Sequence, residues 1–435
     1  NISDEKWMEP TKKWLSMFAV RFGWGVTGTQ PPKEDTHFSV YGVDGGYINS
    51  IGMRPNNVRL TDLRWEKQSA WNLGWNIGLF DDLVTADINL YSHKKTDLMT
   101  EHASIPTTTG FSELIVENGG DMLNKGYEIN LNLNRVKLAG DLAATFNLTF
   151  ANNRNAINGT GVKLPKNGEY MSRVQIDNPF GAIYGLRYKG VYAYSYDQFD
   201  KAQASGATCP VARDEAGSVI YGANGEPMPM YYDYNGTKYA FTGGDAIYED
   251  VNHDGSIDQY DVVYLGSSLP KLTGGFGFRL FYKGWSLNAQ FNYRYGNKIA
   301  NVARMRAENM HGADNQSTAV NYRWRKEGDG ANGGHVLPRA LYGQGYNWMG
   351  SDRFVEDGSF LRLNYLQFSY GFDSKLIKRI GLSRLNLYVS GENLFCLTKY
   401  SGVDPEVNYG DMGVTKDEAI TPRAKSFTFG LTATF

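Results

Sequence analysis

The sequence has 435 residues, with 44 basic and 46 acidic side chains and a formal net charge of −2. This near balance argues against a nucleic-acid partner, because phosphates favour a basic stripe on the protein. Only two cysteines occur, Cys209 and Cys396, which excludes a disulfide framework and a thiolate metal cluster.

The N-terminal residues contain no charged and apolar leader of the kind that directs secretion. We expect either that a targeting segment was removed or that the sequence begins partway through a longer protein. No run of about 18 apolar residues follows anywhere, so no membrane-spanning helix is predicted. The abundance of Tyr, Phe and Gly favours strands and turns instead.

Ten segments with apolar and polar residues in alternation are predicted as strands. In chain order they are 17–27, 66–80, 83–95, 125–136, 142–152, 272–282, 285–296, 359–372, 384–393 and 425–435. Nearly all reach the nine to eleven residues, roughly, that a tilted membrane strand needs, whereas soluble strands average about five or six.

The alternation is clearest in the last segment and in 285–296. In the latter, one face carries Trp285, Leu287, Ala289, Phe291, Tyr293 and Tyr295. The opposite face carries Ser286, Asn288, Gln290, Asn292 and Arg294. A soluble β-sandwich would alternate in the same way, with its apolar residues inward.

The lengths of the connections distinguish a membrane barrel from a soluble β-sandwich, because short and long connections alternate along the chain. Short turns are expected at 81–82, 138–141 and 283–284, with a moderately short, basic connection at 373–383. The long connections are 28–65, 96–124, 153–271, 297–358 and 394–424. Short periplasmic turns and long outer loops are typical of bacterial outer-membrane barrels. Aromatic residues near strand ends, such as Tyr282 and Trp285, fit the interfacial girdles of such a barrel. The sequence therefore predicts an all-β, transmembrane, antiparallel β-barrel wall with long extracellular loops.

Residues 153–271 form a large extracellular loop region, about a quarter of the chain. Tyrosines gather there, as in the stretch MYYDYNG at 230–236. Such a surface suits stacking and hydrogen bonding to sugars or peptides. An equally good interpretation is that the rings only pack the loops against one another.

One stretch of this loop region has the spacing of an EF-hand-type calcium loop. The candidate ligands are Asp250, Asn252, Asp254, Ser256, Asp258 and Asp261, with Gly255 at the sixth position for the sharp turn. Asp261 stands where Glu is usual, and no flanking helices are evident. The alternative is a loop built from Asx turns without an ion. Because four clustered carboxylates repel one another, the sequence favours structural Ca²⁺ here.

Motifs of enzymes are absent: there is no HExxH, GxSxG or Walker-type sequence, and the six histidines are scattered. The chain is therefore not expected to be an enzyme. Phe435, with apolar residues at every second position before it, resembles the signal that the barrel-assembly machinery recognises.

Several stretches, in order along the chain, resemble the SusC/RagA family of TonB-dependent outer-membrane transporters of Bacteroidetes. They are WLS at 14–16, YSHKKTDLM at 91–99, NKGYE at 124–128, YGLRYKGVY at 184–192, YLGSSLPK at 264–271, GNKI at 296–299, GSFLRL at 358–363 and GENLF at 391–395.

The resemblance implies a barrel of about 22 strands in the outer membrane of a Gram-negative bacterium, plugged by an N-terminal domain. It also implies a SusD-like surface lipoprotein as partner, the TonB complex as energy source, and an oligosaccharide or peptide as substrate. With about ten strands, no plug and no TonB box, residues 1–435 are expected to be the C-terminal portion of such a barrel. Bare strand edges do not persist in lipid, so further strands must pair with the first and last segments.

The expected function is active import of a large solute. The alternative is a passive porin or substrate-specific channel, which would have no plug and no energy coupling.

Overall fold

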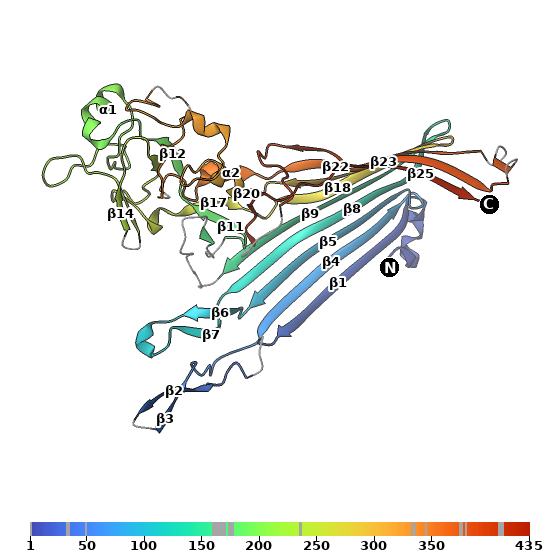
Figure 1. Cartoon of the computed structure of the whole chain (residues 1–435). Helices are drawn as coiled ribbons and strands as arrows, with labels where there is room; N and C mark the ends of the chain where they lie inside the picture. Colours follow the sequence, from blue (N-terminus) through green and yellow to red (C-terminus); the bar gives the residue numbers. More distant parts are fainter. Residues whose placement is uncertain are drawn as a thin grey trace.

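The computed structural model covers the whole chain (Figure 1). It describes residues 2–31, 35–47, 50–158, 171–172, 178–234, 237–331, 334, 336–343, 346–373, 377–378, 381–407 and 413–435.

A single ten-stranded sheet, called the wall below, dominates the structure. Its strands, in sheet order, are β1 (Leu15–Thr29), β4 (Glu66–Leu79), β5 (Val84–Thr96), β8 (Asp121–Ala139), β9 (Leu142–Asn158), β18 (Leu272–Tyr282), β19 (Trp285–Tyr295), β22 (Phe360–Gly371), β23 (Arg384–Thr398) and β25 (Ser426–Thr434). Every neighbouring pair is antiparallel. All ten predicted strands are confirmed; β18 has the predicted bounds, and β9 continues furthest beyond its predicted end.

Alternation gives the wall an apolar face and a polar face. On the apolar face Ile129 of β8 lies between Ile88 and Phe150 of the adjacent strands. One residue further, Asn130 lies between Asp87 and Thr149 on the polar face. The apolar face is open, with Phe22 70% and Phe429 82% exposed. An outward apolar band and a polar interior are what a membrane barrel requires.

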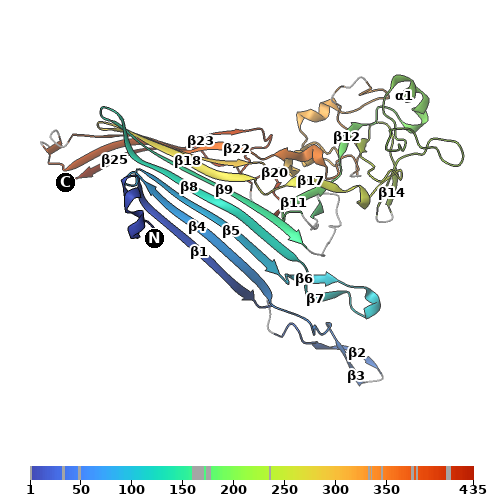
Figure 2. The same cartoon turned by 180° about the vertical axis from the view of Figure 1, so that it is seen from behind.

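The short turns and the long connections lie at opposite ends of the wall, as predicted. Asp81, Asp82, Lys283 and Gly140 all have φ between 52° and 60° at the short turns, the left-handed conformation that tight hairpins need. Both chain ends lie at this turn end, and the long connections lie together at the other, the loop end (Figures 1 and 2).

The first two long connections form separate hairpins that project from the loop end (Figure 1). They are β2 (Tyr41–Tyr47) with β3 (Ser50–Pro55), and β6 (Met99–Ser104) with β7 (Glu113–Asn118). The 3-10 helices η1 (Ile2–Asp4) and η2 (Lys6–Lys13) precede β1, and η3 (Thr107–Thr109) lies between β6 and β7.

The other three long connections pack into one unit, which we call the loop body. Its strands are β10 (Met171–Ser172), β11 (Ala182–Gly185), β12 (Tyr188–Val191), β13 (Tyr231–Tyr234), β14 (Thr237–Ala240), β15 (Ala246–Tyr248), β16 (Ser256–Ile257), β17 (Val263–Ser267), β20 (Lys298–Asn301), β21 (Val355–Asp357) and β24 (Lys416–Asp417). Its helices are η4 (Tyr196–Gln198), α1 (Phe199–Ser205), η5 (Gln259–Asp261), α2 (Val302–Ala307), η6 (Thr318–Tyr322) and η7 (Asp352–Phe354). Sequence periodicity predicted none of these short elements.

The wall is open at both edges. Within the described residues, β1 pairs with β4 alone and β25 with β23 alone. Across that same part of the chain, no helix combines the length and the apolar character needed to cross a bilayer.

Candidate functional site

Amide side chains dominate the polar face of the wall near the loop end. A hollow of about 570 Å³ lies there across β4, β5, β8 and β9. It is lined by Gln68, Asn72, Asn89, Tyr91, His93, Lys95, Asn124, Glu128 and Asn153. Among the described residues, the side chains of Gln68, Asn72 and Asn153 have no hydrogen-bond partner. These amides are therefore free to bind a solute or another part of the protein.

A second hollow of about 560 Å³ lies beside it, toward β1. Here the polar side chains bind one another. Arg21 Nη2 lies 3.4 Å from Asp87 Oδ2 and 3.2 Å from Asn89 Oδ1. Asn76 and Asn89 donate to the Asp87 carboxylate at 2.7 and 2.6 Å. Asn72 lines both hollows, but the charged groups of the second, Arg21 and Asp87, already pair with each other there.

The core of the loop body joins all three of its connections. Ile183 comes from the first, Phe354 from the second and Val414 from the third, and the three are buried in one cluster. Strand β20 pairs with β21 on one side and with β24, from the last connection, on the other. The three connections are thus held as one body rather than as independent loops.

A buried carboxylate, Asp245, ties the first connection to the second. Its side chain is fully buried and lies 2.6 Å from Nε of Arg339. Tyr239 donates its hydroxyl to the same carboxylate at 2.6 Å, and Asn347 donates at 3.2 Å. Burial, followed by the hydrogen bond to Asp245, raises the pKa of Tyr239 above its ordinary value. A satisfied buried network of this kind fixes a unique arrangement.

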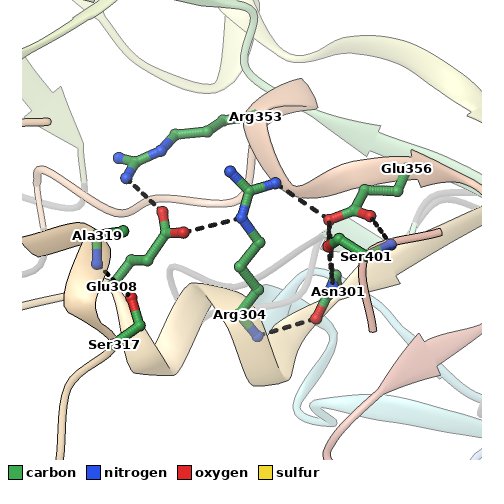
Figure 3. A network of polar contacts seen from close by, with 8 residues as sticks. All are labelled: Asn301, Arg304, Glu308, Ser317, Ala319, Arg353, Glu356 and Ser401. Atoms are coloured by element: carbon green, nitrogen blue, oxygen red, sulfur yellow. Dashed lines mark hydrogen bonds and ion pairs between the residues drawn. The ribbon is translucent and has the colours of Figure 1, made fainter. Parts of the chain in front are cut away.

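A second ionic network surrounds helix α2 (Figure 3). Arg304 lies between Glu308 and Glu356, at 2.9 and 3.1 Å, and Arg353 reaches Glu308 at 2.8 Å. Ser401, from the last connection, donates to Glu356 through its hydroxyl at 2.7 Å. Burial alone would raise the pKa of Glu356, but the hydrogen bonds from Ser401 and Arg304 hold it below its ordinary value.

Arg362 of β22 attaches the last connection to the polar face of the wall. Its side chain and those of Asp404 and Glu406 are 5%, 5% and 7% exposed. The guanidinium lies 2.5 Å from Asp404 and 2.8 Å from Glu406. Arg423 adds a contact of 3.3 Å to Glu406. The connection between β23 and β25 is therefore folded inward and clamped.

The six residues of the predicted calcium loop extend from Asp250 through the two-residue strand β16 to the 3-10 helix η5. Gly255 has a φ of 81°, as expected at the sixth position. The carboxylate of Asp250 accepts from the Gly255 N–H at 2.8 Å, and that of Asp254 accepts from the Ser256 N–H at 2.8 Å. Asp258 caps η5, Ser256 begins β16, and Asn252 donates to the Asp254 carboxylate at 2.8 Å.

Asp261 is fully buried, and its two oxygens accept from the N–H groups of Val251 and Asp258 at 2.7 and 2.8 Å. Burial raises the pKa of this carboxyl to about 6. Within the described residues, no three His, Cys, Asp or Glu side chains are arranged so that they could hold a metal ion. Calcium binding by these residues stays a prediction.

The loop tyrosines divide between the two interpretations of the sequence. Tyr239 stacks on Tyr346 with ring centroids 4.3 Å apart, and Tyr232 contacts Tyr346 at 4.8 Å. These rings pack two connections together. By contrast, Tyr221 and Tyr260 of residues 153–271 are 54% and 68% exposed and remain available for stacking.

Sequence reasoning missed the ionic networks around Asp245, Arg304 and Arg362. Arg362 and Asp404 are 42 residues apart, and Arg339 and Asp245 are 94 apart. No local spacing could signal such pairs.

Comparison with known proteins identifies the fold independently. Residues 7–217 match the family described as TonB dependent receptor-like, beta-barrel.

The chain is similar to the TonB-dependent receptor P3 of Formosa agariphila, with 27% identity across 100% of this chain and 41% of that protein. It is similar to the TonB-dependent receptor SusC of Bacteroides thetaiotaomicron, with 26% identity across 97% of this chain and 38% of that protein. The chain thus spans about two fifths of the length of these relatives.

Among solved structures, that of the RagAB peptide transporter superposes with a TM-score of 0.67 at 22% identity, covering 100% of this chain and 42% of that one. This match supports the fold. Relatives of this kind place the chain in the outer membrane of a Gram-negative bacterium. They also bear out the expectation that it is not an enzyme, because the family is one of receptors. Residues 7–217 thus match the TonB-dependent receptor-like β-barrel family, and the chain is a SusC/RagA-like part of such a barrel.

Proposed function

We propose that this chain forms part of the wall and the outer mouth of an active importer for a large solute, an oligosaccharide or a peptide. The observation that carries the proposal is the two-faced wall: its apolar face suits lipid, and its polar face presents free amides in a hollow of about 570 Å³. The interlocked loop body lies at the loop end of the wall (Figure 1).

The chemistry of the polar face supports a neutral, hydrogen-bonding cargo. Gln68, Asn72 and Asn153 offer both donors and acceptors, and Lys95 and Glu128 balance in charge. The exposed rings of Tyr322 and Tyr342 add stacking surfaces in the loop body. One solved structure that the chain resembles is that of the RagAB peptide transporter, which supports peptides as one of the two classes.

The proposal includes partners that this chain does not itself supply. A SusD-like surface lipoprotein would cover the mouth, and further strands would complete the barrel. A plug domain and the TonB complex would couple transport to energy. The longer relatives support this, since the chain covers 41% of receptor P3.

We also propose that Ca²⁺ binds at Asp250, Asn252, Asp254, Ser256, Asp258 and Asp261 and fixes the first connection of the loop body. The ligand spacing and the tight turn at Gly255 support this.

Uptake measurements test import directly. Cells lacking the intact protein, and cells lacking TonB, should both lose uptake of a labelled oligosaccharide or peptide from a defined panel. Uptake that persists without TonB and without a proton gradient would instead indicate the passive channel.

A matched pair of variants tests the role of the polar face. Asn72→Leu removes a free amide from the hollow, whereas Leu73→Ala changes the adjacent residue on the apolar face. Import predicts reduced uptake for the first and near-normal uptake for the second at equal surface levels.

A further inference from the structure

A small cavity of about 280 Å³ lies in the first connection of the loop body, beside the paired strands β12 and β15. The buried side chains at its base are largely apolar and comprise Tyr192, Cys209, Val211, Met230 and Tyr248. Exposed side chains, among them Lys189, Arg213 and Asp214, form a polar rim. An apolar recess with polar groups around it is the usual form of a ligand-binding pocket.

The charged groups of the rim are of both signs and already have partners. Lys189 Nζ lies 2.9 Å from Oε1 of Glu249. Arg213 donates to a backbone carbonyl at 2.8 Å, and the carboxylates of Asp214 and Asp250 each accept from a backbone N–H at 2.8 Å. The rim therefore favours neither an anionic nor a cationic ligand.

The base of the cavity contains a hydroxyl without a partner. Tyr192 is 5% exposed, and among the described residues its hydroxyl has no hydrogen-bond partner. Burial raises the pKa of Tyr192, and Cys209 and Asp250 are among the groups that raise it further. Since Cys209 and Asp250 line the cavity, the hydroxyl end of Tyr192 lies toward it. An unpaired buried hydroxyl is unfavourable, so a ligand that pairs with it gains affinity.

Size and polarity together distinguish between the two classes of cargo. Pockets that enclose a whole small ligand have roughly 300–1,000 Å³, so a cavity of about 280 Å³ suits a single side chain. A sugar ring carries several hydroxyl groups, and each one that is buried without a partner weakens binding. An apolar ring with one hydroxyl at its tip matches the cavity better, because that hydroxyl can both donate to and accept from Tyr192.

We propose that this cavity is a capture site for the side chain of a tyrosine in a peptide. The ring lies against the apolar base, and its hydroxyl forms a hydrogen bond with the hydroxyl of Tyr192. The peptide backbone lies on the mixed-charge rim. This inference rests on the proposed import function, for which it names peptides as the cargo.

The test measures binding to the full natural protein, purified in mild detergent, by saturation-transfer NMR titrations. The probes are maltotriose and three pentapeptides that carry tyrosine, phenylalanine or glutamate between pairs of glycines. The tyrosine peptide should bind roughly three- to tenfold more tightly than the phenylalanine peptide, the equivalent of one hydrogen bond. The glutamate peptide and maltotriose should bind more weakly than both. Tyr192→Phe should remove the preference for tyrosine, and Ile247→Trp, which fills the cavity, should abolish binding of both aromatic peptides.

Matched controls come from the same hydrophobic core. Tyr188 and Ile220 are partly buried against it, as Ile247 is, but lie outside the cavity lining. Tyr188→Phe and Ile220→Trp should therefore keep both the affinity and the preference. Heat-shifted gel mobility reports folding of every variant, and Ile247→Phe replaces Ile247→Trp if the latter fails to fold.

Three results would overturn the proposal: equal affinity of the wild type for the tyrosine and phenylalanine peptides, a preference that survives Tyr192→Phe, or binding of maltotriose that Ile247→Trp abolishes. The import function fails separately. If tyrosine peptides bind as expected but are not taken up in a TonB-dependent manner, import is refuted and the capture site remains.

Discussion

At the scale of single residues, the clamp at Arg362 is the most consequential contact of the loop body. Asp404 and Glu406 are nearly fully buried against it. Arg362→Met would leave two buried carboxylates without their main counter-charge, which costs about 3–5 kcal/mol. We therefore predict that the connection between β23 and β25 is released from the wall. Hydrogen–deuterium exchange of residues 399–407 and 413–425 should rise strongly in the variant.

Arg21 supplies the matched control for that prediction. It also forms an ion pair on the polar face, with Asp87 at 3.4 Å, but its side chain is 57% exposed. Exposed pairs contribute about 0–1 kcal/mol, so Arg21→Met should leave exchange almost unchanged. Adding Asp404→Asn and Glu406→Gln to Arg362→Met should restore part of the protection. Unchanged exchange in Arg362→Met itself would show that the clamp does not hold the connection.

The calcium loop gives a second prediction at this scale. Extracellular sites of this type bind Ca²⁺ with dissociation constants on the order of 10⁻⁴–10⁻³ M. Millimolar Ca²⁺ should therefore slow proteolysis within residues 250–261, and a chelator should reverse the effect. Asp250→Asn should abolish the protection. Asp214→Asn, an exposed acid of the same connection, should not. Equal cleavage with and without Ca²⁺ would favour an Asx-turn loop without an ion.

At the scale of elements, the two faces of a wall strand should differ in how well they tolerate an introduced charge, even at adjacent positions. Ile129 and Asn130 lie in the middle of β8, on the apolar and polar faces respectively. Ile129→Arg places a charge in hydrocarbon and should destabilise the barrel by about 2–4 kcal/mol. Asn130→Arg lies opposite Asp87 and should cost little. Urea unfolding in lipid vesicles compares the two, and equal stabilities would contradict the assignment of faces.

The wall strands could be predicted because apolar and polar residues alternate along each membrane strand. In β18 each residue alternates between lipid and interior, so its bounds follow from hydropathy alone. Strand β9 was predicted too short because the alternation fails in its last part, where Asn152 and Arg154 are polar although they lie on the face that is otherwise apolar. The loop body lacks such a signal. Two of its two-residue strands, β16 and β24, exist only because distant segments pair with them.

The candidate site, too, could be predicted only where its features depend on local sequence. The turn at Gly255 and the polar character of the wall interior could be predicted from local sequence. Local sequence could not predict which amides line a common hollow, because Gln68 and Asn153 come from strands separated by two others in the sheet. A shallow apolar hollow on the other face, lined by Trp285, Phe368, Leu387 and Phe429, likewise needs the register of four strands, which alternation within one strand cannot supply.

At the scale of the whole molecule, the open edges of the wall decide how the barrel closes. If β1 paired with β25, the barrel would have ten strands, and side chains would fill much of its interior. The relatives, of whose length this chain spans about two fifths, support closure through additional strands instead.

Cysteine cross-linking in the complete protein separates the two closures. On a background with Cys209→Ser and Cys396→Ser, Leu431→Cys would be combined in turn with Phe18→Cys, Val20→Cys and Phe22→Cys of β1. We predict no disulfide in any of the three, because other strands lie between β1 and β25. Leu387→Cys with Leu431→Cys is the positive control, since these residues are register partners at a separation that a disulfide can span. Efficient oxidation of a β1–β25 pair would mean that these ten strands close on themselves, and the larger importer would then have to be abandoned.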